Sequence, residues 1–331
     1  MYSLVITYLR LLFSVFIQKK YIRNHFKPEL DKILKAFPIP ERHYKKLLNY
    51  YSFGVPAMLG YLFSITSGLR MNPKNRYILT NVGALTGVVD DAFDENIIDI
   101  ERVSEFMLHP NHFLPRTNYE HLMRFLGLNV LNSLNETQKE QFMEYCKIVF
   151  ELQEKSKNQK NTEISIQELK FITKQKGGVP FEMYRCLVDS NPTAEELKLY
   201  YEIGALMQLG NDIFDVYKDT EDGIATLPNT NTSLFETELL LNEWLETVLV
   251  QLQKIQLENN RDKRKFINTL LLGMSRCYVC LDQFKSLDQS NIFKVQKYTR
   301  AQLICDMEKV SNLFKSMKYF VILKKRYVQY Y

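Results

Sequence analysis

The sequence has little cysteine and no long apolar run, and each absence excludes a class of protein. Its 331 residues include five scattered cysteines, an odd number that forms no framework of pairs. That pattern excludes a disulfide-rich scaffold and favours reduced thiols and a cytoplasmic location. No segment reaches the roughly 18–20 consecutive apolar residues that a transmembrane helix needs.

Signatures of nucleotide-binding and nucleic-acid-binding proteins are also missing. The chain has no P-loop, no glycine-rich dinucleotide motif after a strand, and no G-x-S-x-G of the serine hydrolases. A formal net charge of +5 is too small to indicate nucleic-acid binding. Cys277 and Cys280 form a lone C-x-x-C, and without a second pair they are predicted to be core thiols rather than zinc ligands.

What the sequence does contain is helical periodicity along nearly its whole length, with no strand-like alternation. Ser or Thr three residues before Glu predicts capped helix starts at Thr137, Ser165, Thr193 and Ser233. The predicted fold class is therefore all-α, and the whole chain is expected to form one helical bundle. The helices of residues 1–36 need not belong to the centre of that bundle. The predicted helical segments are 1–36, 40–70, 74–96, 97–134, 136–158, 165–189 (broken at Gly177, Gly178 and Pro180), 193–219, 233–258, 261–287 and 291–322.

The most informative stretch runs from Asn211 to Asp219 and ends an apolar segment. On a helix, Asn211, Asp215 and Asp219 are spaced i, i+4, i+8 and share one face. An amide oxygen and two carboxylates form a row of hard oxygen donors. Mg²⁺ prefers such ligands and takes the rest of its shell from water and substrate phosphates. Lys218 lies beside the row as a point charge suited to phosphate.

A second acidic cluster, from Asp90 to Glu95, ends another apolar segment. Asp90 and Asp94 are i, i+4 neighbours on one helix face, and Asp91 lies beside them. Two apolar helices that each end in a carboxylate face predict a deep apolar cavity with a metal-lined rim.

Together the two clusters resemble the motifs of the class I isoprenoid synthase superfamily, which includes terpene cyclases, trans-prenyltransferases and squalene/phytoene synthases. The stretch from Asp90 to Asp94 reads DDAFD and matches DDxxD, while Asn211 to Asp219 resembles the second motif of terpene cyclases. Asp215 and Asp219 depart from the serine and glutamate that are commoner there. The resemblance covers roughly residues 55–230.

The resemblance implies an enzyme that ionises an allylic isoprenoid diphosphate with the help of three Mg²⁺ ions. The carbocation would then cyclise or rearrange in an apolar cavity that excludes water. The resemblance assigns catalytic roles to Asp90, Asp91, Asp94, Asn211, Asp215 and Asp219. Each of these residues except Asp91 would be a metal ligand.

Cations to bind the substrate diphosphate are expected as well, and the candidates are Arg76, Lys176, Lys218 and Arg326. Arg76 resembles the arginine ahead of the first motif in squalene/phytoene synthases. Lys176 resembles the basic residue at the helix break of terpene cyclases. Arg326 begins an Arg-Tyr pair similar to the C-terminal pair of the same enzymes.

Within the superfamily, the residues favour a terpene synthase. The Arg-Arg-Gly that follows DDxxD in trans-prenyltransferases is missing after Asp94, which disfavours chain elongation. Squalene/phytoene synthases usually carry arginine where Phe214 stands, yet the spacing from Gln208 through Asp219 and Gly223 to Leu227-Pro228 is similar to theirs. Head-to-head prenyl condensation is therefore the alternative reaction. A non-catalytic helical protein that binds isoprenoids or lipids is the alternative of a different class.

The opening segment, Met1 to Ile17, is apolar except for Arg10 and leads into Lys19 and Lys20. A helix packed on the protein core is the favoured interpretation, and contact with a membrane surface is the alternative. The sequence therefore leaves two possibilities open. One is that this cytoplasmic protein associates peripherally with a membrane, and the other is that it forms a homodimer.

Overall fold

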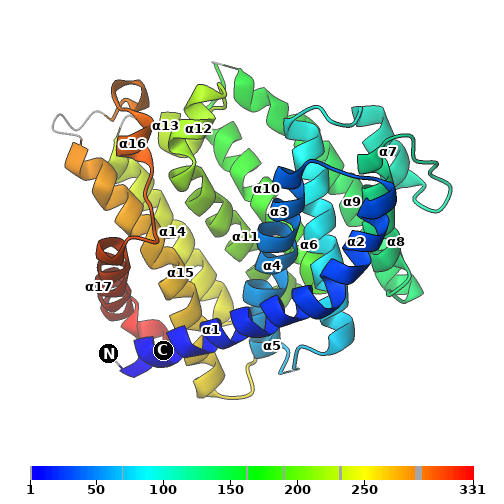
Figure 1. The fold of residues 1–331 in the computed structure, drawn as a ribbon. Helices are drawn as coiled ribbons and strands as arrows, with labels where there is room; N and C mark the ends of the chain where they lie inside the picture. Colours follow the sequence, from blue (N-terminus) through cyan, green and yellow to red (C-terminus); the bar gives the residue numbers. More distant parts are fainter. Residues whose placement is uncertain (1, 69, 162, 189–190, 231–232, 288–292) are drawn as a thin grey trace. The chain divides into compact units, whose positions relative to one another are not determined.

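The computed structural model describes residues 2–68, 70–161, 163–188, 191–230, 233–287 and 293–331, without the side chains of residues 2, 93 and 94. These residues form helices joined by turns, and no strand occurs among them, which confirms the all-α prediction (Figure 1). The chain divides into two compact units. The N-terminal unit comprises Tyr8–Phe150 and Met183–Pro192; the C-terminal unit comprises Met1–Thr7, Glu151–Glu182 and Thr193–Tyr331. The single-domain expectation stays a prediction.

The N-terminal unit is built around one long helix, α6. Its helices are α1 (Tyr2–Tyr21, whose first turns belong to the C-terminal unit), α2 (Lys27–Ala36), α3 (Glu41–Lys46), α4 (Ser52–Gly54), α5 (Gly60–Thr66), α6 (Pro73–Asp94), α7 (Ile100–Leu108), α8 (Asn118–Leu131) and α9 (Glu136–Ser156). α6 packs against α8, α4 and the π-helical turns at Leu47–Tyr51 and Val55–Leu59.

Local sequence explains where α6 begins and ends. The Asn72 side chain caps its first turn by accepting a hydrogen bond from the Asn75 amide at 2.7 Å, and Pro73 follows as the first helical residue. At the other end, Asn96 adopts φ 50°, a left-handed conformation that asparagine tolerates, and the Ile97 amide donates back to the Ala92 carbonyl. The acidic cluster therefore occupies the last turn of the helix.

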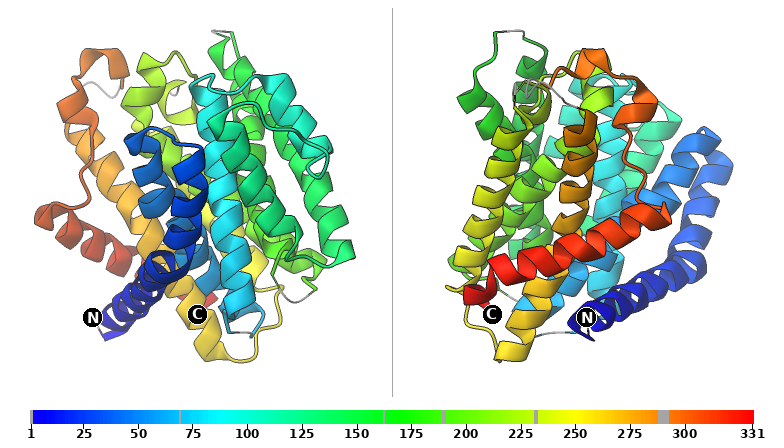
Figure 2. Two further views of the ribbon diagram at one scale, coloured as in Figure 1. Left: turned by 45° about the vertical axis from the view of Figure 1, so that its right-hand side comes forward. Right: turned by 90° about the vertical axis from the view of Figure 1, so that its left-hand side faces the viewer.

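The C-terminal unit is a bundle around α11. Its helices are α10 (Ile166–Cys186, whose last turn belongs to the N-terminal unit), α11 (Ala194–Phe214), α12 (Val216–Glu221), α13 (Leu227–Thr230), α14 (Leu234–Leu252), α15 (Asn260–Leu287), α16 (Arg300–Leu303) and α17 (Val310–Arg326). α11 packs against α14 and α15, and α17 packs across α15 (Figure 2). Gln251 near the end of α14 donates to the Glu195 carbonyl near the start of α11, so these two helices run antiparallel.

The predicted helix starts are correct at Ser165 and Thr193, whose hydroxyls accept hydrogen bonds from the amides three residues later. Ser233 also caps a helix, α14, but accepts from the Phe235 amide. The prediction at Thr137 is wrong by two residues. Asn135 and Gln138 cap each other reciprocally there, and the helix begins at Glu136.

Three helix predictions need larger corrections. α10 continues through Gly177 and Pro180 without the predicted break: all of its residues are helical, although an interior proline has no backbone N–H to donate. The expected helix 193–219 is interrupted at Asp215. The expected helix 291–322 is wrong: a capping box at Thr299 starts only the short α16, and extended residues separate it from α17.

Among the described helices, none is both long and apolar enough to cross a membrane. The five cysteines are all buried and none of them is in a disulfide bond, as the core-thiol prediction for Cys277 and Cys280 requires.

Candidate functional site

The C-terminal unit presents Asn211, Asp215 and Asp219 in a row, which we call the acid row. Although α11 ends at Phe214, the amide of Asp215 donates to the Asn211 carbonyl at 2.9 Å and that of Asp219 to the Asp215 carbonyl at 2.8 Å. The helical i to i−4 pattern thus continues across the interruption, and the three residues share one face. The Asn211 side chain donates to the Asp215 carboxylate at 3.2 Å.

The acid row carries more negative charge than its surroundings balance. Partial burial, together with the carboxylates of Asp212 and Asp215, raises the pKa of Asp219 to about 7. The positive charges of Lys218 and Lys176 act in the opposite direction but do not cancel the effect. A divalent cation bound by these oxygens would relieve the same repulsion, so the donor set fits Mg²⁺.

Asp212, although it is within the motif, faces away from the row into the protein. Its side chain is buried and accepts hydrogen bonds from Gln208 at 2.8 Å and from the Thr173 hydroxyl of α10 at 3.4 Å. Burial raises its pKa to about 6, against the opposing effects of Gln208 and Lys176. Asp212 therefore fastens α11 to α10 and positions the row beside it.

Two of the four predicted diphosphate-binding cations belong to this neighbourhood. Lys176 on α10 lies close enough for its charge to lower the pKa of both Asp212 and Asp219, and Lys218 acts on Asp219 from the adjacent position. The exposed Arg276 on α15 was not predicted, and its guanidinium lies 6.0 Å from the ring centroid of Phe214. Nothing in the sequence around Arg276 signals this proximity.

Arg326 is held elsewhere in the C-terminal unit. Its guanidinium donates to the Asn242 side chain of α14 at 2.5 Å, and the Tyr278 hydroxyl donates to the same oxygen at 2.6 Å. The adjacent Tyr327 is buried and also contacts Asn242. The Arg-Tyr pair therefore fastens the end of α17 to α14, and its described contacts do not join it to the acid row.

The first acidic cluster lies at the end of α6 in the N-terminal unit. Asp90 is exposed, whereas Asp91 is buried. One oxygen of Asp91 accepts hydrogen bonds from Lys46 at 2.7 Å and from the Tyr51 hydroxyl at 2.8 Å. The Asp94 side chain lies outside the described residues. Of the three predicted carboxylates, Asp90 thus faces solvent and Asp91 anchors the neighbouring segment.

The structure does not bring Arg76 to Asp90. Both belong to α6, and 14 residues at about 1.5 Å each separate them by roughly 21 Å along the helix. The Arg76 guanidinium is half-buried and donates to the Gln18 side chain of α1 at 2.7 Å. It secures α1 against α6.

Replacing Asp91 should test its anchoring role. We expect Asp91→Asn to lower the free energy of unfolding by about 1–2 kcal/mol, because the buried Asp91 loses its ion pair with Lys46, whose side chain is 45% exposed and partly screened by solvent. A double-mutant cycle with Lys46→Gln, followed by urea unfolding, should give a coupling energy of about 1 kcal/mol or more. Strictly additive effects would contradict the anchoring role.

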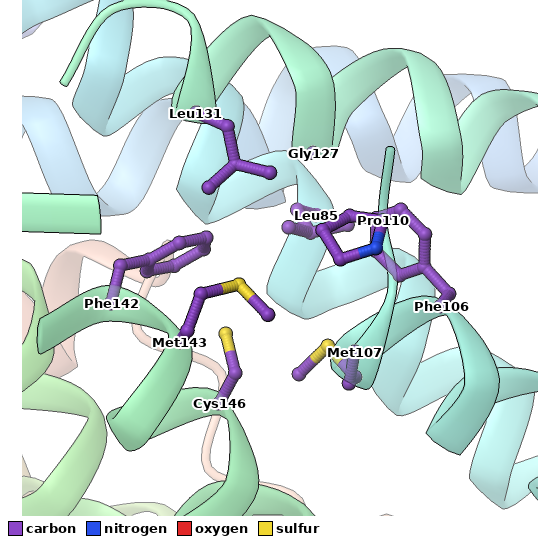
Figure 3. Close-up of a pocket in the computed structure, with 9 residues that line it drawn as sticks. All are labelled: Leu85, Phe106, Met107, Pro110, Gly127, Leu131, Phe142, Met143 and Cys146. Carbon is purple, nitrogen blue, oxygen red and sulfur yellow. The ribbon is translucent and has the colours of Figure 1, made fainter. Parts of the chain in front are cut away.

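An apolar pocket is present in the N-terminal unit, between α7, α8 and α9 (Figure 3). Its lining includes Leu85, Phe106, Met143 and Cys146. The enclosed volume of ≈ 10 Å³ is about that of one water-sized sphere. Ligand sites span roughly 300–1,000 Å³, so this pocket cannot hold an isoprenoid chain, and the predicted deep cavity stays a prediction.

Among the described residues, no group of three or more His, Cys, Asp or Glu side chains forms a metal site. The acid row supplies two carboxylates and one amide, so any complete ligand shell must include water, substrate or further residues. Neither a scan against models of known protein families nor a search of curated proteins finds a match for this chain.

Proposed function

We propose that this protein is a class I isoprenoid synthase of the terpene synthase type, which releases diphosphate from an allylic isoprenoid substrate in a Mg²⁺-dependent reaction. The observation that carries the proposal is the acid row, with its raised Asp219 pKa and with Lys176 and Lys218 beside it. Hard oxygen donors next to ammonium groups are what a metal-bound diphosphate requires.

One exposed apolar side chain precedes the acid row on the same face of α11. Met207 lies one turn before Asn211 and keeps 42% of its surface exposed. An apolar side chain followed by oxygen donors matches the order of groups in an isoprenoid diphosphate, a hydrocarbon tail followed by a charged head. This arrangement supports the choice of an isoprenoid substrate over a purely polar one.

In this proposal each residue has a defined role. Asn211, Asp215 and Asp219 hold metal, while the ligand roles that the resemblance gives to Asp90 and Asp94 stay predictions. When bound, Mg²⁺ supplies the positive charge that stabilises the departing diphosphate. Lys176 and Lys218 add charge on the same side, while Gln208 and Thr173 keep Asp212 from turning into the row.

Mg²⁺ affinity should rise with pH between about 6 and 8. Because the pKa of Asp219 is about 7, a proton competes with the metal below that pH. The apparent affinity should fall by up to about tenfold per pH unit there. Isothermal titration calorimetry at three pH values, in buffers of different ionisation enthalpy, would detect the released proton. Asp219→Asn should remove the pH dependence; the same dependence in this variant would assign the proton to another group.

Head-to-head condensation remains the second candidate, since one further feature resembles squalene/phytoene synthases. Gly223, with φ +66°, ends α12, and the Ile224 amide donates back to the Asp219 carbonyl at 2.7 Å. The chain then re-enters a helix at Leu227 and Pro228. The spacing of Gly223 and Leu227-Pro228, which is similar to that of squalene/phytoene synthases, therefore falls in an ordered turn directly after the acid row.

Product analysis separates the candidates. The purified protein would receive allylic diphosphates of ten, fifteen, twenty and twenty-five carbons singly, with and without isopentenyl diphosphate. A cyclic or rearranged hydrocarbon or alcohol from one substrate is the expected result. A product of doubled carbon number would indicate head-to-head condensation, and turnover only with isopentenyl diphosphate would indicate chain elongation.

A further inference from the structure

The exposed face of α1 is apolar. Leu9, Leu12, Phe13 and Phe16 keep between 55% and 65% of their surface exposed, and Val5, one turn earlier, keeps 54%. At 3.6 residues per turn, these five positions fall within about 100° of arc. They form one continuous stripe, which we call the α1 stripe.

The opposite face of α1 is held by polar contacts. The Ser14 hydroxyl donates to the Ala57 carbonyl at 2.7 Å. Gln18 is completely buried; its amide donates to the Ser52 carbonyl at 2.9 Å, and its oxygen accepts from Arg76. A surface helix of a globular protein normally buries its apolar side and exposes its polar side. α1 also exposes an apolar side, while Ser14 and Gln18 lie on its inner side together with the buried Leu4, so these contacts fix the α1 stripe outward.

Positive charge is concentrated at the C-terminal end of the same stripe. Residues 1–28 contain five Lys and Arg residues and no Asp or Glu. The whole chain has 43 basic and 38 acidic residues, so 43 − 5 leaves 38 basic residues against 38 acidic ones elsewhere. The entire formal net charge of +5 therefore belongs to this segment. Lys19, Lys20 and Arg23 are exposed, and their helical positions prolong the α1 stripe.

From this arrangement we propose that α1 lies on an anionic membrane surface. The α1 stripe inserts among the acyl chains, and Lys19, Lys20 and Arg23 contact the acidic headgroups. The inference does not depend on the proposed catalytic function, since it uses no residue of the acid row.

Charge also distinguishes a membrane from a second copy of this chain. A two-fold dimer would place the α1 stripe of one copy on that of the other. Each copy would then bring its own cations, without a single acid from residues 1–28, to the same interface. Like charges oppose that association, whereas acidic headgroups complement it.

Vesicle sedimentation with the full chain tests the proposal. Binding should be at least about tenfold stronger to phosphatidylcholine vesicles containing about a third phosphatidylglycerol than to phosphatidylcholine alone. Phe13→Gln with Phe16→Gln should weaken binding to the anionic vesicles at least about tenfold. A matched control changes Phe235→Gln and Leu239→Gln, which are equally exposed on α14, and should leave binding unchanged. Equal binding to both vesicles, or none, would overturn the proposal.

A fluorescence reporter locates the contact. The only tryptophan, Trp244, is buried and should not respond to lipid. Phe16→Trp should therefore add emission that shifts to shorter wavelength with anionic vesicles. Binding without that shift would mean that another surface docks. If the Phe13 and Phe16 replacements instead lower the oligomeric mass while vesicles stay unbound, the α1 stripe is an interface between copies, and the proposal fails.

Discussion

Replacing Asp219 by asparagine is expected to abolish diphosphate release and to make the metal-free protein more stable at pH 8. Release should fall at least about a hundredfold, because the variant loses a metal-binding carboxylate. In the folded protein the pKa of Asp219 is raised to about 7, so folding favours the protonated carboxyl. Stability is therefore lost as pH rises from about 4 through 7, and at pH 8 the ionised group is a cost that asparagine removes.

The expected gain is about 1–2 kcal/mol in the free energy of unfolding, after allowance for solvent screening of a partly exposed group. Urea unfolding at pH 8 without metal, alongside a diphosphate-release assay, measures both effects. Asp222→Asn is a matched control, because Asp222 is exposed at the end of α12 and outside the acid row. It should alter neither quantity. An Asp219→Asn protein that releases diphosphate like wild type would contradict the assignment.

Gly177→Ala is expected to lower the free energy of unfolding by about 3 kcal/mol or more. A Cβ at Gly177 would lie 2.1 Å from the Gly204 carbonyl oxygen, and a Cβ at Gly204 would lie 2.2 Å from that of Gly177. Because backbone atoms form the contact, α10 and α11 would have to move apart. The same movement would carry Thr173 and Lys176 away from Asp212, so Mg²⁺ affinity should fall as well.

The control for this prediction is Gly273→Ala in α15. A Cβ there meets no atom within 4 Å, and alanine favours helix over glycine by about 0.5–1 kcal/mol. This variant should be slightly more stable than wild type in thermal or urea unfolding. Wild-type stability of Gly177→Ala would show that the two helices are not held by this contact.

Features set by neighbouring residues could be predicted from the sequence. The Thr193 cap and the spacing of Asn211, Asp215 and Asp219 depend on helical geometry alone. Features that depend on packing between distant residues could not be predicted from the sequence. Pro180 indicated a helix break, because proline has no backbone N–H to donate, yet α10 continues through it.

The candidate site divides in the same way. The charge of Lys176 acts on Asp212 and Asp219, and its diphosphate-binding role stays a prediction. Thr173 lies 39 positions from Asp212 in the chain and no local pattern connects them. The resemblance predicts diphosphate contacts for Arg76 and Arg326, yet each is hydrogen-bonded to a residue far away in sequence. Likewise α1 buries Leu4 but exposes a stripe of other apolar residues, because hydrogen bonds from Ser14 and Gln18 to residues far away in sequence fix its orientation.

Diphosphate release by the wild-type protein from single allylic diphosphates, measured with Mg²⁺ and with a chelator, decides whether this protein is an isoprenoid synthase. We expect release with Mg²⁺ and its loss with the chelator. Absence of release from every substrate, by protein that is folded and still binds an isoprenoid, would contradict that expectation and would favour a non-catalytic isoprenoid-binding protein.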